Sequence, residues 1–133
     1  MIKLFNQWFK PRWLIAAVFF TGLVICFSHI PQDNLGQQTV LLQIDKILHV
    51  TAYGIITFLA ISSVKFRPYF RIKLIVFILV ISIGYLDEYY QSFVGRTSSI
   101  VDWLADISGV VLGLIVFEVK YHLKLLQSGP VWD

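Results

Sequence analysis

The chain has 133 residues, of which 57% are hydrophobic and only 14% are charged, and its formal net charge at pH 7 is +3. Soluble domains average about 45–50% apolar and about 25% charged residues, so this composition indicates a membrane protein. Four spanning helices of about 20 residues each would leave roughly 50 residues for loops and both ends, which excludes a soluble DNA-binding module, a Rossmann enzyme or a disulfide-stabilised secreted domain. We expect no nucleic-acid partner.

The first apolar run, residues 13–30, follows three basic residues and predicts a membrane-spanning helix. It ends in Cys-Phe-Ser-His-Ile and lacks the small-residue site of a cleaved signal peptide, so we interpret it as a retained helix. The single cysteine of the chain, Cys26, cannot form an internal disulfide. The polar stretch 32–38 that follows predicts a loop.

Three further apolar runs predict helices over residues 47–64, 72–92 and 100–119. The third run is purely apolar only as far as residue 86, so it reaches spanning length only when Asp87 and Glu88 are included near the interface. The sequence therefore predicts an all-α integral membrane bundle of four transmembrane helices, which forms a single domain over residues 1–133.

The basic residues predict the orientation of this bundle. Three Lys or Arg residues precede the first run, one follows it, four follow the second run, one follows the third and two follow the fourth. By the positive-inside rule, this alternation places both termini and the basic middle loop in the cytoplasm. The two polar loops, and the polar helix ends beside them, then face outward.

A first polar cluster marks the beginning of the second predicted helix. Asp45, His49 and Tyr53 are spaced four residues apart and therefore share one helix face, and Lys46 adjoins them. In one interpretation Asp45 and Lys46 cap the helix at the interface, while His49 and Tyr53 bond to neighbouring groups. In the other, the four residues bind a ligand, and His49 transfers a proton near neutral pH.

A second cluster closes the third predicted helix. Adjacent carboxylates at Asp87 and Glu88 are costly to leave unpaired, and acids within a membrane segment are functional candidates by default. Gln91 shares a helix face with each of these carboxylates, and Arg96 follows in the loop after the helix. The planar Arg96 side chain can hold a carboxylate or a phosphate by two parallel hydrogen bonds. The alternative is an internal carboxylate–Arg pair that only fixes the loop.

The third cluster is a stripe along the fourth predicted helix. Asp102, Asp106, Gly109 and Gly113 follow one another at spacings of four, three and four. The two glycines form a G-x-x-x-G element, which predicts close packing against a neighbouring helix, most simply one of the same chain. Packing does not require the two aspartates.

Together the three clusters are expected to converge on one outward-facing pocket. Its carboxylates can bind a divalent cation, and His49 can add a nitrogen ligand or act as an acid or base. Alternatively, Lys46 and Arg96 hold an anionic lipid headgroup or a pyrophosphate while the acids orient them. The sequence does not choose between cation binding and anion binding. The candidates are His49, Asp87 and Glu88 for catalysis; Asp45, Lys46, Tyr53, Gln91, Arg96, Asp102 and Asp106 for ligand binding; and Asp87, Glu88, Asp102, Asp106 and His49 for a metal ion.

Over about residues 30–120, this joint pattern of acids, His49, Tyr53, Gln91 and Arg96 resembles the VanZ-like family of small polytopic membrane proteins. The resemblance implies a multi-pass protein of the bacterial cytoplasmic membrane. The family is named after a member that confers low-level resistance to the glycopeptide teicoplanin. It supplies no catalytic assignment that can be transferred to these residues.

Our leading hypothesis is a membrane protein whose polar pocket binds or modifies the headgroup of an envelope lipid or of a lipid-linked glycan, with a lipid-linked envelope precursor as a candidate partner. One alternative is a metal-dependent hydrolase or transferase that acts on a phospholipid or a polyprenyl phosphate. The other is a non-catalytic scaffold of envelope machinery. The sequence makes no prediction of the oligomeric state.

Overall fold

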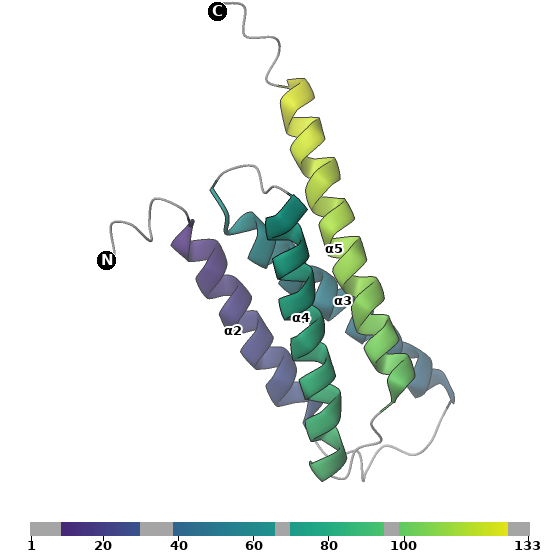
Figure 1. The fold of residues 1–133 in the computed structure, drawn as a ribbon. Helices are drawn as coiled ribbons and strands as arrows, with labels where there is room; N and C mark the ends of the chain where they lie inside the picture. The colour runs from purple at the N-terminus through teal and green to yellow at the C-terminus, as the bar shows by residue number, and fades with distance from the viewer. Residues whose placement is uncertain (1–8, 30–38, 66–69, 95–98, 128–133) are drawn as a thin grey trace, which may run out of the picture.

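The computed structural model describes residues 9–29, 39–65, 70–94 and 99–127, with side chains from residue 44 onward in the second range. These residues form four long helices, and a short 3-10 helix follows the third of them. Their directions alternate along the chain, so that one end of the bundle gathers two helix ends and two helix beginnings (Figure 1). We call this end, at the bottom of Figure 1, the site end. The elements are α2 (Pro11–Ser28), α3 (Thr39–Ser62), α4 (Phe70–Gln91), η1 (Ser92–Val94) and α5 (Ile100–Gln127).

The all-α prediction with four helices is confirmed. Three of the described helices, α2, the segment Ile44–Ser62 of α3, and α5, are long and apolar enough to cross a membrane. α4 has 22 residues, and its crossing of the membrane stays a prediction. The orientation relative to the cytoplasm also stays a prediction.

Two predicted helix boundaries are wrong, because the helices continue beyond their apolar runs. α3 begins at Thr39 instead of residue 47, and α5 ends at Gln127 instead of residue 119. The added end of α5 is rich in Lys and Leu, which are good helix formers, and Figure 1 shows it rising beyond the other helices. Asp45 and Lys46 therefore lie within α3, and the interpretation that they cap this helix is wrong.

The other boundaries differ from the prediction by at most two residues, and α5 begins at Ile100 as predicted. α2 begins at Pro11, where proline is favoured at the first helical turn, and its last helical residue is Ser28. α4 spans Phe70–Gln91, close to the predicted 72–92. The predicted loop over 32–38 lies outside the described residues.

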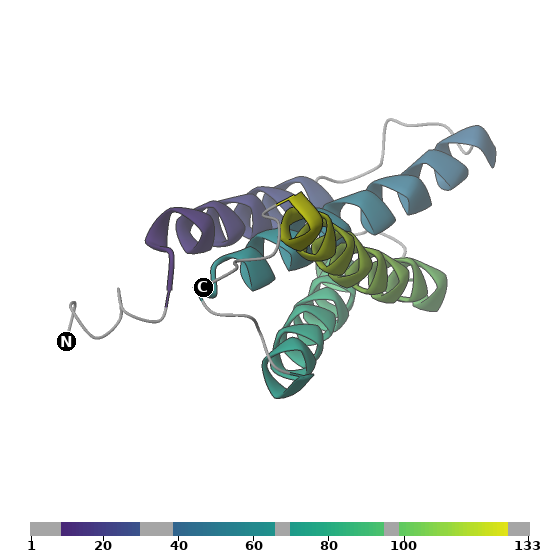
Figure 2. The ribbon, with the colours of Figure 1, turned by 90° about the horizontal axis from the view of Figure 1, so that it is seen from above.

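α3 and α5 pack backbone to backbone through glycines. A Cβ atom on Gly109 would collide with the carbonyl oxygen of Val50, and one on Gly113 would collide with that of Gly54. Viewed from above, α5 crosses over α3 (Figure 2). The predicted G-x-x-x-G packing against a helix of the same chain is confirmed, and it fixes how the polar residues of α3 and α5 meet.

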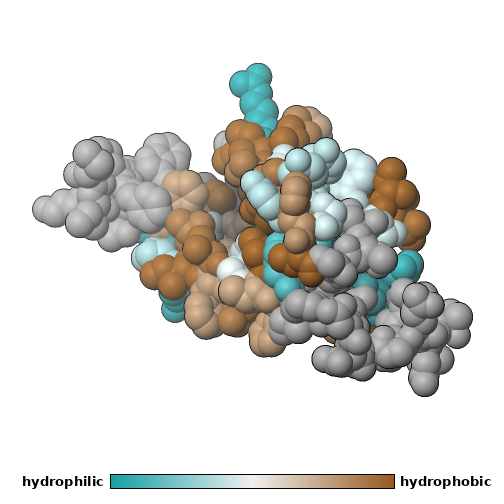
Figure 3. All heavy atoms as spheres, turned by 90° about the horizontal axis from the view of Figure 1, so that it is seen from below, coloured by the Kyte–Doolittle hydropathy of each residue, from teal (hydrophilic) through white to brown (hydrophobic). Residues whose placement is uncertain are grey.

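The outer surface of the bundle is largely apolar. Large side chains such as Ile15, Phe19 and Ile78 are more than half exposed, while Tyr53 and Val110 belong to a small buried core. Lipid tails are as apolar as leucine side chains, so such a surface is typical of a helix bundle in a bilayer. At the site end, hydrophilic residues lie among the hydrophobic ones (Figure 3).

Candidate functional site

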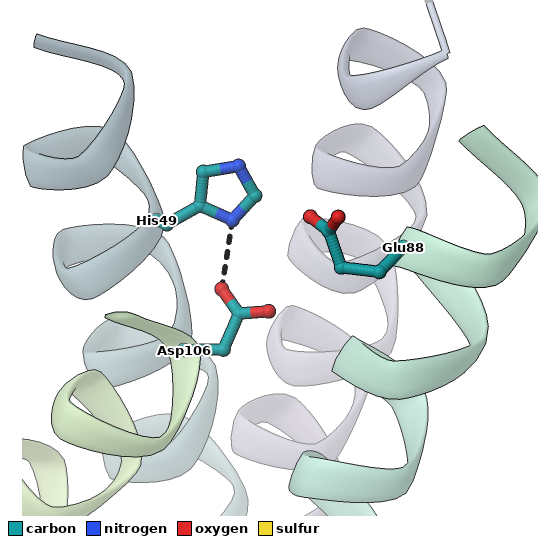
Figure 4. Close-up of side chains that lie close together, drawn as sticks. All are labelled: His49, Glu88 and Asp106. Carbon is teal, nitrogen blue, oxygen red and sulfur yellow. Dashed lines mark hydrogen bonds and ion pairs between the residues drawn. The ribbon is translucent and has the colours of Figure 1, made fainter. Parts of the chain in front are cut away.

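Three buried side chains from three helices meet at the site end: His49 of α3, Glu88 of α4 and Asp106 of α5. One nitrogen or oxygen atom from each lies within 4.8 Å of the others. His49 Nδ1 lies 2.8 Å from Asp106 Oδ1, and Glu88 points toward this pair from the facing helix (Figure 4). We call these three residues the central triad.

The central triad lies a short way inside the apolar helices. His49 is five residues from Ile44, where the apolar segment of α3 begins, and Asp106 is six residues from Ile100. At 1.5 Å per residue, the two residues lie about 8 and 9 Å inside these helix ends. The site is therefore buried in protein but close to one end of the bundle.

Several polar atoms of this region are buried without a hydrogen bond. Among the described residues they are Tyr53 Oη, Glu88 Oε1 and Asp106 Oδ2. Gly84 leaves room for the last of these, since a Cβ atom at Gly84 would lie 2.8 Å from Asp106 Oδ2. Unsatisfied buried polar atoms cost free energy of folding, and more so when they are charged. Contacts among the described residues thus leave one oxygen of Glu88 and one of Asp106 unsatisfied.

Glu88 ties α4 to the beginning of α5. Its Oε2 accepts a hydrogen bond of 3.0 Å from the backbone N–H of Ser99, the residue just before α5. The Ser99 hydroxyl in turn accepts a hydrogen bond from the N–H of Val101, as a helix cap does. One oxygen of Glu88 is therefore engaged by the scaffold, and Oε1 has no hydrogen-bond partner among the described residues.

Asp87 belongs to a separate network between α2 and α4. Its Oδ1 accepts a 2.6 Å hydrogen bond from the Ser28 hydroxyl and lies 3.4 Å from His29 Nδ1. Its Oδ2 accepts a hydrogen bond of 3.2 Å from Gln91 Nε2. Since both oxygens are engaged, Asp87 holds helices together and is less available to a ligand than Glu88.

Ser28 and His29 are site-end residues that the sequence interpretation missed. They close the first apolar run, which was interpreted only as a membrane anchor. The signal that could have found them is a pair of polar residues at the end of an apolar helix, on the side where the other clusters were expected to converge.

The remaining candidates lie at the rim or outside the described residues. Lys46 Nζ pairs with Asp102 Oδ1 at 3.1 Å, and the Lys46 side chain is 38% exposed. Asp45 is partly buried beside a cavity. Arg96, predicted to bind a ligand or alternatively to pair with a carboxylate of its cluster, lies outside the described residues.

The cavity beside Asp45 has a volume of about 400 Å³ and lies between α2 and α3. His49 therefore belongs to both the cavity wall and the central triad, and Tyr53 lies in the cavity wall beside it. Phe27 and Leu48 of its wall are also more than half exposed on the outer surface, so the cavity adjoins the face that lipid would cover. Its apolar lining is Val24, Phe27, Leu48 and Ala52, and its polar lining is Ser28, Asp45, His49 and Tyr53.

The chemistry available to the triad follows from its hydrogen bond. A carboxylate only accepts hydrogen bonds, so His49 Nδ1 donates to Asp106, and the Nε2 of a neutral ring then accepts a proton. An imidazole oriented by a carboxylate in this way can serve as a general base.

Comparison with known proteins identifies a family model that matches this chain. The family model described as VanZ/LLP1 matches residues 3–121, which is nearly the whole chain. Neither the search of curated proteins nor the search of solved structures gives a match.

Proposed function

The chain belongs to the VanZ/LLP1 family, and from this membership and the site geometry we propose that it binds the headgroup of an envelope lipid or lipid-linked envelope precursor. The observation that carries the proposal is the cavity between α2 and α3, in which an apolar wall adjoins a polar wall containing His49 and Tyr53. A lipid likewise joins an apolar chain to a polar headgroup. Its chain would lie along Val24 and Ala52, and its headgroup beside His49.

The depth of the site supports a lipid ligand. His49 and Asp106 lie about 8 and 9 Å inside their apolar helix ends, so a headgroup reaches them from the bilayer surface by a small displacement. Phe27 and Leu48, exposed at the cavity edge, would contact the neighbouring acyl chains. A soluble metabolite would gain nothing from this apolar wall.

A second candidate, catalysis on the bound lipid, is favoured by the hydrogen bond between His49 and Asp106. In a hydrolase or transferase acting on a phospholipid or a polyprenyl phosphate, His49 Nε2 would take a proton from the attacking water or hydroxyl. Asp106 would orient the ring and stabilise the imidazolium that forms. Such a reaction would take place in the bacterial cytoplasmic membrane.

Photo-crosslinking tests the binding proposal. The full chain is placed in nanodiscs with phosphatidylglycerol that carries a diazirine in its acyl chain, and labelled peptides are mapped by mass spectrometry. Labelling is expected to concentrate on the cavity residues of α2 and α3. Ala52→Trp, which fills the cavity, should lower this labelling several-fold, whereas Ile78→Trp on the exposed face of α4 should not.

Headgroup recognition is tested by competition in the same assay. Unlabelled phosphatidylglycerol, phosphatidylethanolamine and undecaprenyl phosphate are added in turn, and the proposal expects them to differ in how strongly they suppress labelling of the cavity. Equal labelling of every exposed helix, unchanged by Ala52→Trp and by headgroup, would overturn lipid binding and favour the non-catalytic scaffold. A link to teicoplanin resistance is tested separately, by the susceptibility of a bacterial strain with and without this protein.

A further inference from the structure

The central triad has the composition and spacing of a metal site. It offers one imidazole nitrogen and two carboxylates, with one atom of each residue inside a 4.8 Å limit. Two ligand atoms that are each about 2.1 Å from one ion lie about 3–4 Å apart, so small side-chain movements close the triad on a cation. From this geometry we propose that His49, Glu88 and Asp106 together bind a divalent transition-metal ion of the Mn²⁺ or Zn²⁺ class.

The unpaired oxygens of the triad are a second observation that points to a cation ligand. Glu88 and Asp106 are only 5% and 0% exposed, yet Glu88 Oε1 and Asp106 Oδ2 have no hydrogen-bond partner within the described part of the chain. Figure 4 shows the two carboxylates directed toward the space between their helices. A cation in that space would satisfy both oxygens and remove the repulsion between the two acids.

The charge around the triad also favours a cation over an anion. Within the described residues, five acids lie in the three clusters of the site end, and Lys46 is the lysine among them. Lys46 already pairs with Asp102 at the rim. An anionic headgroup would meet this excess of carboxylates directly, whereas a bound ion would neutralise part of it and offer the headgroup a positive contact.

The ligand set selects the class of ion. Mg²⁺ and Ca²⁺ prefer all-oxygen ligands, whereas an imidazole nitrogen suits Fe²⁺ and Zn²⁺, and the two carboxylates suit Mn²⁺. With Nδ1, the nitrogen nearest Asp106, as the ligand atom, the ring carries its proton on Nε2, and the lone pair of Nδ1 replaces the N–H that now meets Asp106. His49 is then a ligand and not a base. Three protein ligands leave coordination positions open for water or a substrate oxygen.

Metal binding can be measured without knowing any activity, so its failure and the failure of lipid binding are separate results. The full chain in detergent is freed of metal by a chelator and titrated with Mn²⁺, and the free ion is followed by electron paramagnetic resonance. We expect one Mn²⁺ per chain, displaced by Zn²⁺ but not by an equal concentration of Mg²⁺ or Ca²⁺. Glu88→Gln should weaken binding by about tenfold or more.

The matched control is Glu118→Gln. Glu118 pairs with Lys73 and lies away from the site end, so its replacement should leave Mn²⁺ binding unchanged. Wild-type protein with bound Mn²⁺ should also show hyperfine coupling to one imidazole nitrogen, and His49→Gln should abolish it. This signal tests the proposal even where Glu88→Gln does not fold. Absence of stoichiometric Mn²⁺ binding, absence of the nitrogen coupling, or equal weakening by Glu118→Gln would overturn the proposal.

Discussion

His49 of α3 donates a 2.8 Å hydrogen bond to Asp106 of α5, one helical turn from the point where the backbones of the two helices touch at Gly109. The glycine contact brings the helices close enough for two short side chains to meet directly. The bond is therefore a consequence of helix packing, and it is buried at both ends, with side chains 8% and 0% exposed.

The two residues should be energetically coupled. His49→Ala and Asp106→Ala are each expected to lower the free energy of unfolding, because each leaves a buried partner without its hydrogen bond. A hydrogen bond to a charged group is worth about 1.5–3 kcal/mol, and the coupling energy of the double-mutant cycle should fall in that range. Unfolding in mixed detergent micelles, followed by circular dichroism, measures all four proteins. Strictly additive losses would contradict the coupling.

The sequence predicted which helix ends meet, but not which side chains contact one another there. Alternating helix directions place the beginnings of α3 and α5 beside the end of α4, so the spacing of apolar runs was enough to predict that polar clusters gather at one end. Which residues meet also depends on the rotation and depth of each helix. The structure pairs Asp102 with Lys46, and Asp87 with Ser28, and neither pairing follows from the spacing.

The difference between Asp87 and Glu88 shows the same limit. The two are adjacent in sequence and looked equivalent as candidates, but a helix turns by about 100° per residue. Asp87 consequently faces α2, where Ser28 bonds to one of its oxygens, and Gln91 of its own helix bonds to the other, while Glu88 faces His49 and Asp106. The predicted boundaries of α3 and α5 were wrong for a different reason. An apolar run marks the part of a helix that can lie in the hydrocarbon of a bilayer, and the helix itself can continue beyond it.

Gly84→Ala should disturb the site from a position that carries no functional group. The new Cβ atom would lie 2.8 Å from Asp106 Oδ2 and 3.2 Å from the ring of Tyr53, so the Asp106 carboxylate must move. We expect a loss of about 1–3 kcal/mol in the free energy of unfolding, as for other overpacked cores. Gly22→Ala is the matched control, because nothing lies within 4 Å of its added Cβ, and it should be neutral or slightly stabilising. Equal thermal midpoints for the two variants would show that Asp106 does not need the space at Gly84.

Ser28→Ala tests whether α2 is part of the polar site or only an anchor. The change removes a 2.6 Å hydrogen bond from a hydroxyl to the buried carboxylate of Asp87, whose other partners then have to hold it. Loss of a hydrogen bond to a charged group predicts a decrease of about 1.5–3 kcal/mol in the free energy of unfolding. Ser82→Ala offers the control, since its exposed hydroxyl bonds only to the carbonyl of Ile78 on its own helix, and its replacement should change stability by less than about 0.5 kcal/mol. If the variants are equally stable in micelles, the Ser28–Asp87 bond does not contribute to holding α2 against α4.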